Sequence, residues 1–140
     1  MNLYNKIMSS INESLKTLLL EDNSYNSPEI TWDDNCAEIH YKGGDATLCD
    51  HRIEYFRELK DNEYELAILY TPKSYRHQGI ATAIMNEVIK IAEQKQCNIV
   101  LYASPFNSEM TIDTLIEFYK SFGFEHDSLS NNKQYLIYYG

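Results

Sequence analysis

The chain has 140 residues and a formal net charge of −9, with 44% hydrophobic and 24% charged residues. This length allows a single core, so we expect one domain over residues 1–140, and the composition is that of an ordinary soluble globular protein. The negative charge makes nucleic acid and anionic membranes poor partners, and no apolar stretch is long enough to span a bilayer.

Three cysteines, Cys36, Cys49 and Cys97, are scattered along the chain without a Cys-x-x-Cys pattern. An odd and scattered set of cysteines is typical of free thiols in a reducing compartment. The first residues also lack the basic segment and apolar block of a signal peptide. We therefore expect a cytoplasmic protein.

Residues 3–20 show the pattern of an amphipathic helix. Apolar side chains recur at helical spacing, while Asn, Lys and Glu residues occupy the opposite side. The apolar positions are Leu3, Ile7, Ile11, Leu15 and Leu18. We expect this helix to pack on a sheet; the alternative is that its apolar side forms the interface of a homodimer.

Alternation of polar and apolar residues then predicts an antiparallel meander. The expected strands are residues 29–33, 36–42, 46–59 and 63–70. Gly43-Gly44-Asp45 is expected to form a hairpin turn, and Trp32 to anchor the first strand. The third strand does not keep a strict alternation, so we expect a β-bulge near His51 or Phe56.

Acidic residues are concentrated in this meander. The segment from Glu29 to Glu65 holds eleven acidic and four basic residues, a net charge of −7. A solvated surface explains such a segment. The alternative is an acidic lobe that attracts a cationic substrate such as an amine.

A strand, a short loop and a helix follow at the centre of the chain. Residues 66–70 are mostly apolar, and apolar side chains then recur at helical spacing at Ile80, Ile84, Val88 and Ile91. Gly79 opens this helix, whose free first-turn N–H groups and dipole favour an anion such as a pyrophosphate. Residues 99–103 predict a parallel interior strand, which completes a β-α-β unit.

The C-terminal part predicts a second helix and two strands. The helix is expected over residues 112–122, with Thr111 as its N-cap and Gly123 as its C-terminal stop. Residues 124–126 and 134–139 are expected to form the final strands.

Two motifs make the chain resemble the GNAT acetyltransferase superfamily. Residues 76–81, Arg-His-Gln-Gly-Ile-Ala, have the Arg-x-x-Gly-x-Ala pattern of the family's acetyl-CoA pyrophosphate loop. Residues 119–124, Tyr-Lys-Ser-Phe-Gly-Phe, have the Tyr-x-x-x-Gly-Phe pattern of the helix that follows the interior strand. The resemblance implies an α/β fold with a mixed, mostly antiparallel, splayed sheet flanked by helices, here preceded by an N-terminal helix.

The resemblance further implies acetyl transfer from acetyl-CoA to a primary amine by direct attack, without a metal. The pantetheine arm would bond to the strand backbone, and the pyrophosphate to the loop amides. The positions that match the family's cofactor contacts are Ile68, Tyr70, Arg76, His77, Gln78, Gly79, Ala81 and Thr82. Tyr119 matches the family's general acid, which protonates the departing thiolate; a phenol is protonated at neutral pH and suits this role.

The base that deprotonates the amine is less well defined. Glu63 and Glu65 lie on the strand that leads into the cofactor loop, where family members often carry a carboxylate base. His40 and His51, on preceding strands, are alternative bases because an imidazole titrates closer to neutrality.

Departures from the family's pattern keep two alternatives open. Ile112 and Leu115 stand where the family often has an asparagine and an alanine, so one common side-chain contact to CoA is missing. The chain could therefore be an acyl-CoA-binding or interaction module without turnover. A different nucleotide- or phosphate-binding β-α-β protein is the second alternative.

Overall fold

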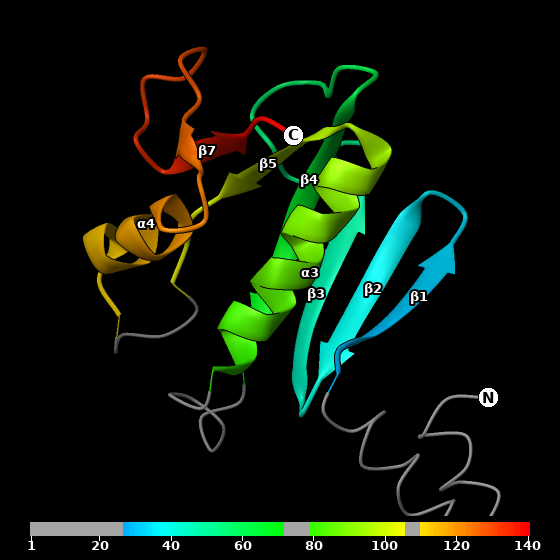
Figure 1. Cartoon of the computed structure of the whole chain (residues 1–140). Coiled ribbons are helices and arrows are strands. Elements are labelled where there is room, and N and C mark those ends of the chain that lie inside the picture. Colours follow the sequence, from blue (N-terminus) through cyan, green and yellow to red (C-terminus); the bar gives the residue numbers. More distant parts are fainter. Residues whose placement is uncertain (1–26, 72–78, 106–109) are drawn as a thin grey trace, which may run out of the picture.

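A seven-stranded sheet organises the part of the chain that this computed structural model describes, residues 27–71, 79–105 and 110–140. The elements in chain order are β1 (Glu29–Asp33), β2 (Cys36–Tyr41), β3 (Gly44–Cys49), β4 (Glu63–Tyr70), α3 (Ile80–Lys95), β5 (Asn98–Tyr102), α4 (Ile112–Lys120), β6 (Glu125–His126) and β7 (Tyr135–Tyr138). The strand order is β1-β2-β3-β4-β5-β7-β6 (Figure 1). The helix expected over residues 3–20 and the loop residues Arg76, His77 and Gln78 lie outside the described residues.

Strands β1 to β4 form the predicted antiparallel meander. The turn between β2 and β3 is Lys42–Gly43, one residue earlier than expected, because Gly44 already pairs with Tyr41. Lys42 and Gly43 have φ angles of 49° and 85°, as a two-residue hairpin of type I′ requires. Trp32, on the edge strand β1, is 42% exposed, so it does not anchor that strand in the core.

The prediction of a long strand over residues 46–59 is wrong. Strand β3 ends at Cys49, and an irregular segment, residues 50–62, leads to β4. Three backbone amides of this segment donate to the Glu65 carboxylate rather than to a neighbouring strand. The bulge expected near His51 or Phe56 is also misplaced, because the register shift lies between Thr47 and Leu48.

Strands β4 and β5 are parallel, as predicted, but they pair over only half of β4. Their register runs from Glu63↔Asn98 to Leu66↔Leu101. Beyond this point β5 continues along β7, while β4 stays with β3 as far as Asp45↔Tyr70. The sheet is therefore mixed, mostly antiparallel and splayed between β4 and β5.

Helix α3 lies on one face of the sheet, roughly along the direction of the strands, and contacts β2 and β3 (Figure 1). Its predicted apolar side is buried, including Ile80, Ile84, Val88 and Ile91. A Cβ on Gly44 would lie 2.7 Å from Ile80 Cγ2, so this close approach of helix and hairpin depends on a glycine. No helix among the described residues is long and apolar enough to cross a membrane.

Helix α4 begins as the sequence predicts. The Thr111 side chain accepts a hydrogen bond from the Thr114 amide at 3.1 Å, which confirms Thr111 as the N-cap. The helix ends at Lys120, two residues earlier than expected, and Gly123 follows with a left-handed φ of 100°. This helix buries Ile116 and Tyr119.

The expectation of three free thiols is wrong for two of the cysteines. Cys36 and Cys49 form a disulfide, and Cys97 is free and buried. The hairpin explains the pairing: Cys36 begins β2, Cys49 ends β3, and the register places them directly opposite each other with Cα atoms 4.1 Å apart. Cysteine spacing alone carries no such information, because the strand register decides which side chains meet.

Candidate acyl-CoA site

A cleft of about 160 Å³ opens where β4 and β5 separate. Its lining comes from the segment before β4, from both strands, from the chain after β5 and from α4. The lining residues are Glu54, Glu65, Leu66, Ala67, Leu69, Leu101, Tyr102, Ser104 and Tyr119. The splay in the sheet therefore places one predicted acid, Tyr119, and one predicted base, Glu65, on the same cavity.

The N-terminus of α3 carries the described part of the predicted phosphate loop. Gly79 is the N-cap with a φ of 73°, a left-handed conformation that side chains rarely adopt. It offers no side-chain hydrogen bond to the first turn, and the first turn contains no acidic residue. The first-turn amides, at Ala81 and Thr82 among others, therefore have no capping group from Gly79 and suit an anion.

Ile68 and Tyr70 lie on the half of β4 that β5 does not cover. Their partners on the other side are Thr47 and Asp45 of β3. The side chains are 46% and 44% exposed, respectively. The cleft lining in this half-strand consists of Ala67 and Leu69 rather than Ile68 or Tyr70, so the pantetheine contacts at Ile68 and Tyr70 stay a prediction.

Tyr119 combines burial with access to the cleft. Its side chain is only 7% exposed and packs against Phe118 and Phe124, with ring centroids 5.4 and 5.9 Å away. Burial raises the pKa of Tyr119 because it penalises the phenolate. The phenol is therefore protonated at neutral pH, as the proposed role of proton donor requires.

Glu65 lines the cleft but is also bound by the chain before β4. Its carboxylate accepts hydrogen bonds from the amides of Ile53, Glu54 and Tyr55 at 2.8, 3.0 and 3.3 Å. The side chain is almost fully buried, at 3% exposure. Glu65 thus holds segment 50–62 against the sheet and places Glu54 at the cleft.

Glu63 belongs to a buried ionic cluster outside the cleft lining. Arg57 donates to both Glu63 oxygens, at 2.7 and 3.0 Å, and to Asp127 at 2.9 Å. Tyr55 adds a hydrogen bond to Asp127 at 2.8 Å. Burial alone would raise the pKa of Glu63, but the Arg57 guanidinium and the Lys60 amide outweigh it, so this pKa is lowered.

The two alternative bases lie elsewhere. His40 is exposed on β2, one strand beyond β3, and forms an ion pair with Asp45. The Asp45 hydrogen bond raises the pKa of His40. His51 lies beside the disulfide, and neither histidine is part of the cleft lining.

An aromatic cluster borders the cleft and was not predicted. Tyr102 lines the cleft and packs on Tyr135 at 4.8 Å between ring centroids; Phe56 packs on Tyr135 at 4.6 Å and on Tyr55 at 4.9 Å. These rings come from segment 50–62, β5 and β7. Only the tertiary fold brings such distant positions together, so the sequence carries no local signal for them.

A sequence model of one protein family, described as "Acetyltransferase (GNAT) domain", matches residues 37–126. No curated protein matches the chain significantly. The matched region contains the described part of the phosphate loop, the splayed strands and the Tyr119 motif.

Solved structures of this fold resemble the chain. The anti-CRISPR protein AcrVA5 superposes with a TM-score of 0.60 at 22% identity, covering 74% of this chain and 98% of that one. The PaiA N-acetyltransferase of Thermoplasma acidophilum, solved in complex with coenzyme A, gives a TM-score of 0.51 at 19% identity over 91% of this chain and 70% of that one.

Tetrahymena GCN5 gives a TM-score of 0.52 at 12% identity, covering 99% of this chain and 82% of that one. At these identities each likeness concerns the fold alone. The family match, however, extends over more than half of the residues, so the chain belongs to the GNAT acetyltransferase family.

Proposed function

We propose that the protein transfers an acetyl group from acetyl-CoA to a primary amine by direct attack. The observation that carries this proposal is the cleft between β4 and β5, with the protonated Tyr119 phenol in its wall. Coenzyme A in the related PaiA structure supports acetyl-CoA as the cosubstrate.

The cofactor would use two parts of the described chain. The pantetheine arm would lie along the part of β4 that no described strand covers on the β5 side, next to Ile68 and Tyr70. The pyrophosphate would meet the first-turn amides of α3, next to Gly79. Arg76, His77 and Gln78 complete this loop in the proposal; their side chains lie outside the described residues.

In the proposed reaction the amine attacks the thioester carbonyl and forms a new C–N bond. The C–S bond then breaks, and Tyr119 gives its proton to the departing thiolate. The amine loses one proton to a base, and this proton returns through solvent to the Tyr119 phenolate, so the products are an amide and free CoA thiol. No covalent enzyme intermediate is needed, because the amine is itself the nucleophile.

We assign the base to Glu65 rather than to Glu63. Glu65 borders the cleft, and its two oxygens accept three amide hydrogens, which leaves acceptor capacity for a bridging water. Glu63 accepts the same number of hydrogen bonds, from Arg57 and the Lys60 amide, but it does not line the cleft. Neither His40 nor His51 lines the cleft.

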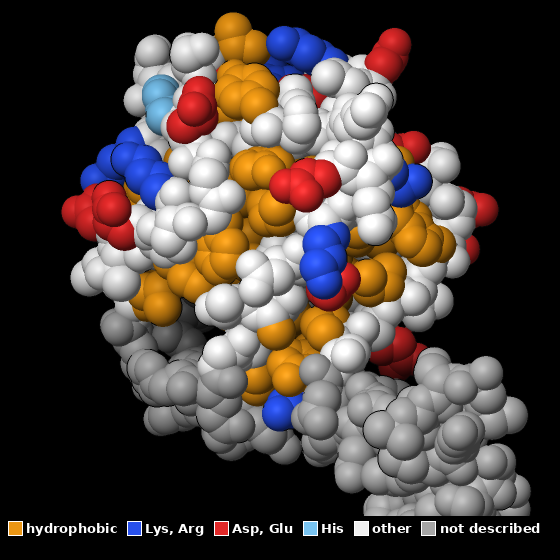
Figure 2. Space-filling view, in the orientation of Figure 1, with side chains coloured by type: hydrophobic (Ala, Val, Ile, Leu, Met, Phe, Trp, Pro, Cys, Tyr) orange, Lys and Arg blue, Asp and Glu red, His pale blue; other side chains and the backbone are white. Residues whose placement is uncertain are grey.

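The acceptor in this proposal is a cationic small molecule or a lysine side chain of a protein. Glu54 and the Tyr102 ring face the same cleft and would attract an ammonium group. On the face shown in Figure 2, acidic and basic side chains are interspersed among hydrophobic ones, so acidic side chains form no continuous patch there.

One related structure, the KacTA complex, contains DNA; it superposes with a TM-score of 0.52 at 17% identity. For this chain, the net charge of −9 favours a cationic partner over nucleic acid. A cytoplasmic location and a possible homodimer stay predictions.

The rival function is an acyl-CoA-binding module without turnover. The observation that favours it is Ile112, which stands at the family's asparagine position and is exposed at the start of α4. Tight acetyl-CoA binding without thiol release would support this rival.

The test combines binding and turnover. Acetyl-CoA should raise the melting temperature of the protein, whereas ATP and NAD should not. A thiol-release screen with polyamines, small monoamines and lysine peptides should then find at least one acceptor whose amide product is seen by mass spectrometry. Failure of acetyl-CoA to bind would contradict both functions.

A further inference from the structure

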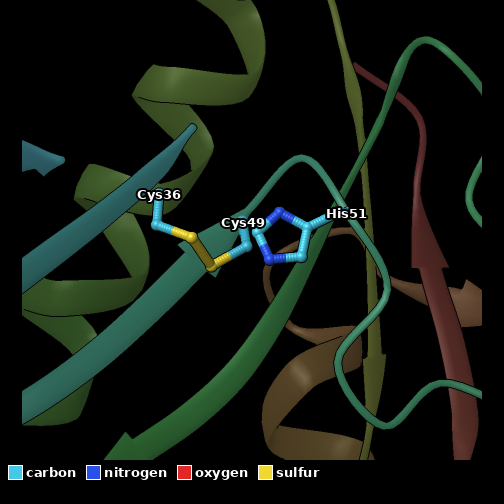
Figure 3. Close-up of side chains that lie close together, drawn as sticks. All are labelled: Cys36, Cys49 and His51. Atoms are coloured by element: carbon cyan, nitrogen blue, oxygen red, sulfur yellow. A yellow bond between two sulfur atoms is a disulfide. The ribbon is translucent and has the colours of Figure 1, made fainter. Parts of the chain in front are cut away.

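Two sulfur atoms and one imidazole lie together at the open end of the β2–β3 hairpin (Figure 3). Cys36 and Cys49 are bonded across the hairpin, and one ligand nitrogen of His51 lies within 4.8 Å of both sulfurs. Cys49 is 2% exposed, whereas the His51 side chain is 61% exposed. None of the three residues lines the acyl-CoA cleft.

The backbone keeps these groups together independently of the disulfide. The Cys36↔Cys49 pair closes a ladder that runs without interruption to Tyr41↔Gly44. The Asp50 amide then donates to the Asn35 carbonyl at 3.0 Å, which extends the contact between the strands by one residue on each side. Reduction of the bridge therefore leaves two thiols facing each other, with His51 two residues from Cys49.

The surroundings of His51 also resemble those of a metal ligand. Its Nδ1 lies 3.3 Å from the Asp50 Oδ1 carboxylate oxygen. A histidine that binds a metal through one ring nitrogen commonly donates its other N–H to a carboxylate, which fixes the tautomer and the ring orientation. This arrangement leaves Nε2 of His51 as the metal-binding nitrogen.

We propose that the reduced protein binds a zinc-type divalent ion through Cys36, Cys49 and His51. Two thiolates and one imidazole bind Zn²⁺ better than they bind Mg²⁺ or Ca²⁺. A water molecule would complete the tetrahedral coordination of the ion. This site is independent of acetyl-CoA and of the acetyl-transfer reaction.

The site and the disulfide are alternative states of the same residues. A thiol reductant exchanges with the Cys36–Cys49 bond and leaves with its own sulfurs oxidised to a disulfide, so that both cysteines become thiols. The ion then displaces one proton from each thiol as the two S–metal bonds form. Exchange of the dithiol with a low-molecular-weight disulfide, which is reduced to two thiols, re-forms the Cys36–Cys49 bond and releases the ion. The site is therefore available only under reducing conditions.

The test is a titration of the full chain with Co²⁺ and Zn²⁺, after reduction with a metal-free phosphine and in the oxidised state. The reduced protein should show a thiolate-to-cobalt charge-transfer absorption that stoichiometric Zn²⁺ removes, and the oxidised protein should show none. Circular dichroism checks that the reduced chain is folded. Thiol counting under denaturing conditions checks that all three cysteines are reduced. A folded, reduced protein without this absorption would overturn the proposal.

Variants separate the ligands from general metal binding. His51→Ala should weaken zinc affinity by at least about 10-fold, and Asp50→Asn by about 10-fold, because the first is a ligand and the second orients it. His40→Ala is the matched control, since His40 is also an exposed, carboxylate-paired histidine but lies away from the sulfurs. Cys97→Ala should leave binding unchanged. Zinc binding that does not depend on His51, or that survives loss of Cys36, would contradict the assignment.

Discussion

The two halves of β4 differ in what surrounds them. Residues Glu63–Leu66 pair with β3 or β5 and bury two carboxylates that hold segment 50–62. Residues 68–70 pair with β3 and, within the described chain, with no strand on their other side; Ile68 and Tyr70 are exposed. We call Glu63–Leu66 the fixed half of β4 and the remaining residues, up to Tyr70, its open half. The cleft lies where the two halves meet. The predictions below test this division, beginning with the largest expected effect.

Arg57→Ala should strongly destabilise the fixed half. The substitution leaves Glu63 and Asp127, whose side chains are 1% and 4% exposed, without their shared cation. Breaking a buried ion pair by removing one partner costs about 3–5 kcal/mol. Urea denaturation followed by fluorescence measures the change in the free energy of unfolding.

The control for this prediction is Arg52→Ala in the same segment. Arg52 pairs with Glu58 at 3.1 Å, but both side chains are exposed, so the expected cost is below about 1 kcal/mol. Equal losses for the two arginine variants would show that the Arg57 cluster does not hold the segment.

Tyr119→Phe should affect turnover and leave the fixed half intact. Removing the phenolic proton donor should slow thiol release by about 100-fold, which corresponds to roughly 2.7 kcal/mol, with little change in acetyl-CoA affinity. Tyr138→Phe is the matched control, because the Tyr138 hydroxyl contacts Glu93 at 3.5 Å and does not line the cleft. Unchanged turnover in the Tyr119 variant would exclude Tyr119 as the general acid.

Low pH should reduce the free energy of unfolding of the wild-type protein through the carboxylates bound by Arg57. Burial alone would raise the pKa of Asp127, but the Leu129 amide, the Tyr55 hydroxyl and Arg57 outweigh it, so this pKa is lowered, as is that of Glu63. A lowered carboxyl pKa stabilises the fold at pH values above the unfolded pKa of about 4, and this stabilisation is lost as the pH falls through the folded pKa.

The loss on acidification should be smaller than the loss in Arg57→Ala, because protonation neutralises the carboxylates rather than leaving them charged and unpaired. Unfolding free energies measured between pH 7 and pH 3 check the slope below about pH 4. The same slope in a Glu63→Gln variant would contradict the contribution of Glu63.

The elements with a local sequence signal could be predicted better than the contacts of the fixed half. Continuous apolar runs predicted β4 and β5, periodic apolar residues predicted α3, and the Thr111 cap predicted the start of α4, because each signal is local. The fixed half depends on contacts between distant residues. The sequence pattern placed Tyr55 and Phe56 in a strand. In the structure the Tyr55 amide instead donates to the Glu65 side chain. An alternation of polar and apolar residues cannot predict such a contact.

Gly79→Ala should have the smallest effect. It tests the proposed pyrophosphate contact at the N-terminus of α3. A Cβ at Gly79 meets nothing within 4 Å, so the cost is conformational: a φ of 73° is unfavourable for alanine by about 1–2 kcal/mol. If the loop amides bind the pyrophosphate, any relaxation of this backbone moves them, and acetyl-CoA affinity falls by up to about 10-fold along with stability.

Gly123→Ala is the comparison, because Gly123 also has a left-handed φ, of 100°, and lies against Tyr138. That variant should lose at least as much stability without losing affinity in the folded protein, since Gly123 is not in the proposed cofactor path. Isothermal titration with acetyl-CoA and thermal melts measure the two quantities separately. Equal affinity losses in both glycine variants would mean that the α3 N-terminus contributes nothing specific to cofactor binding.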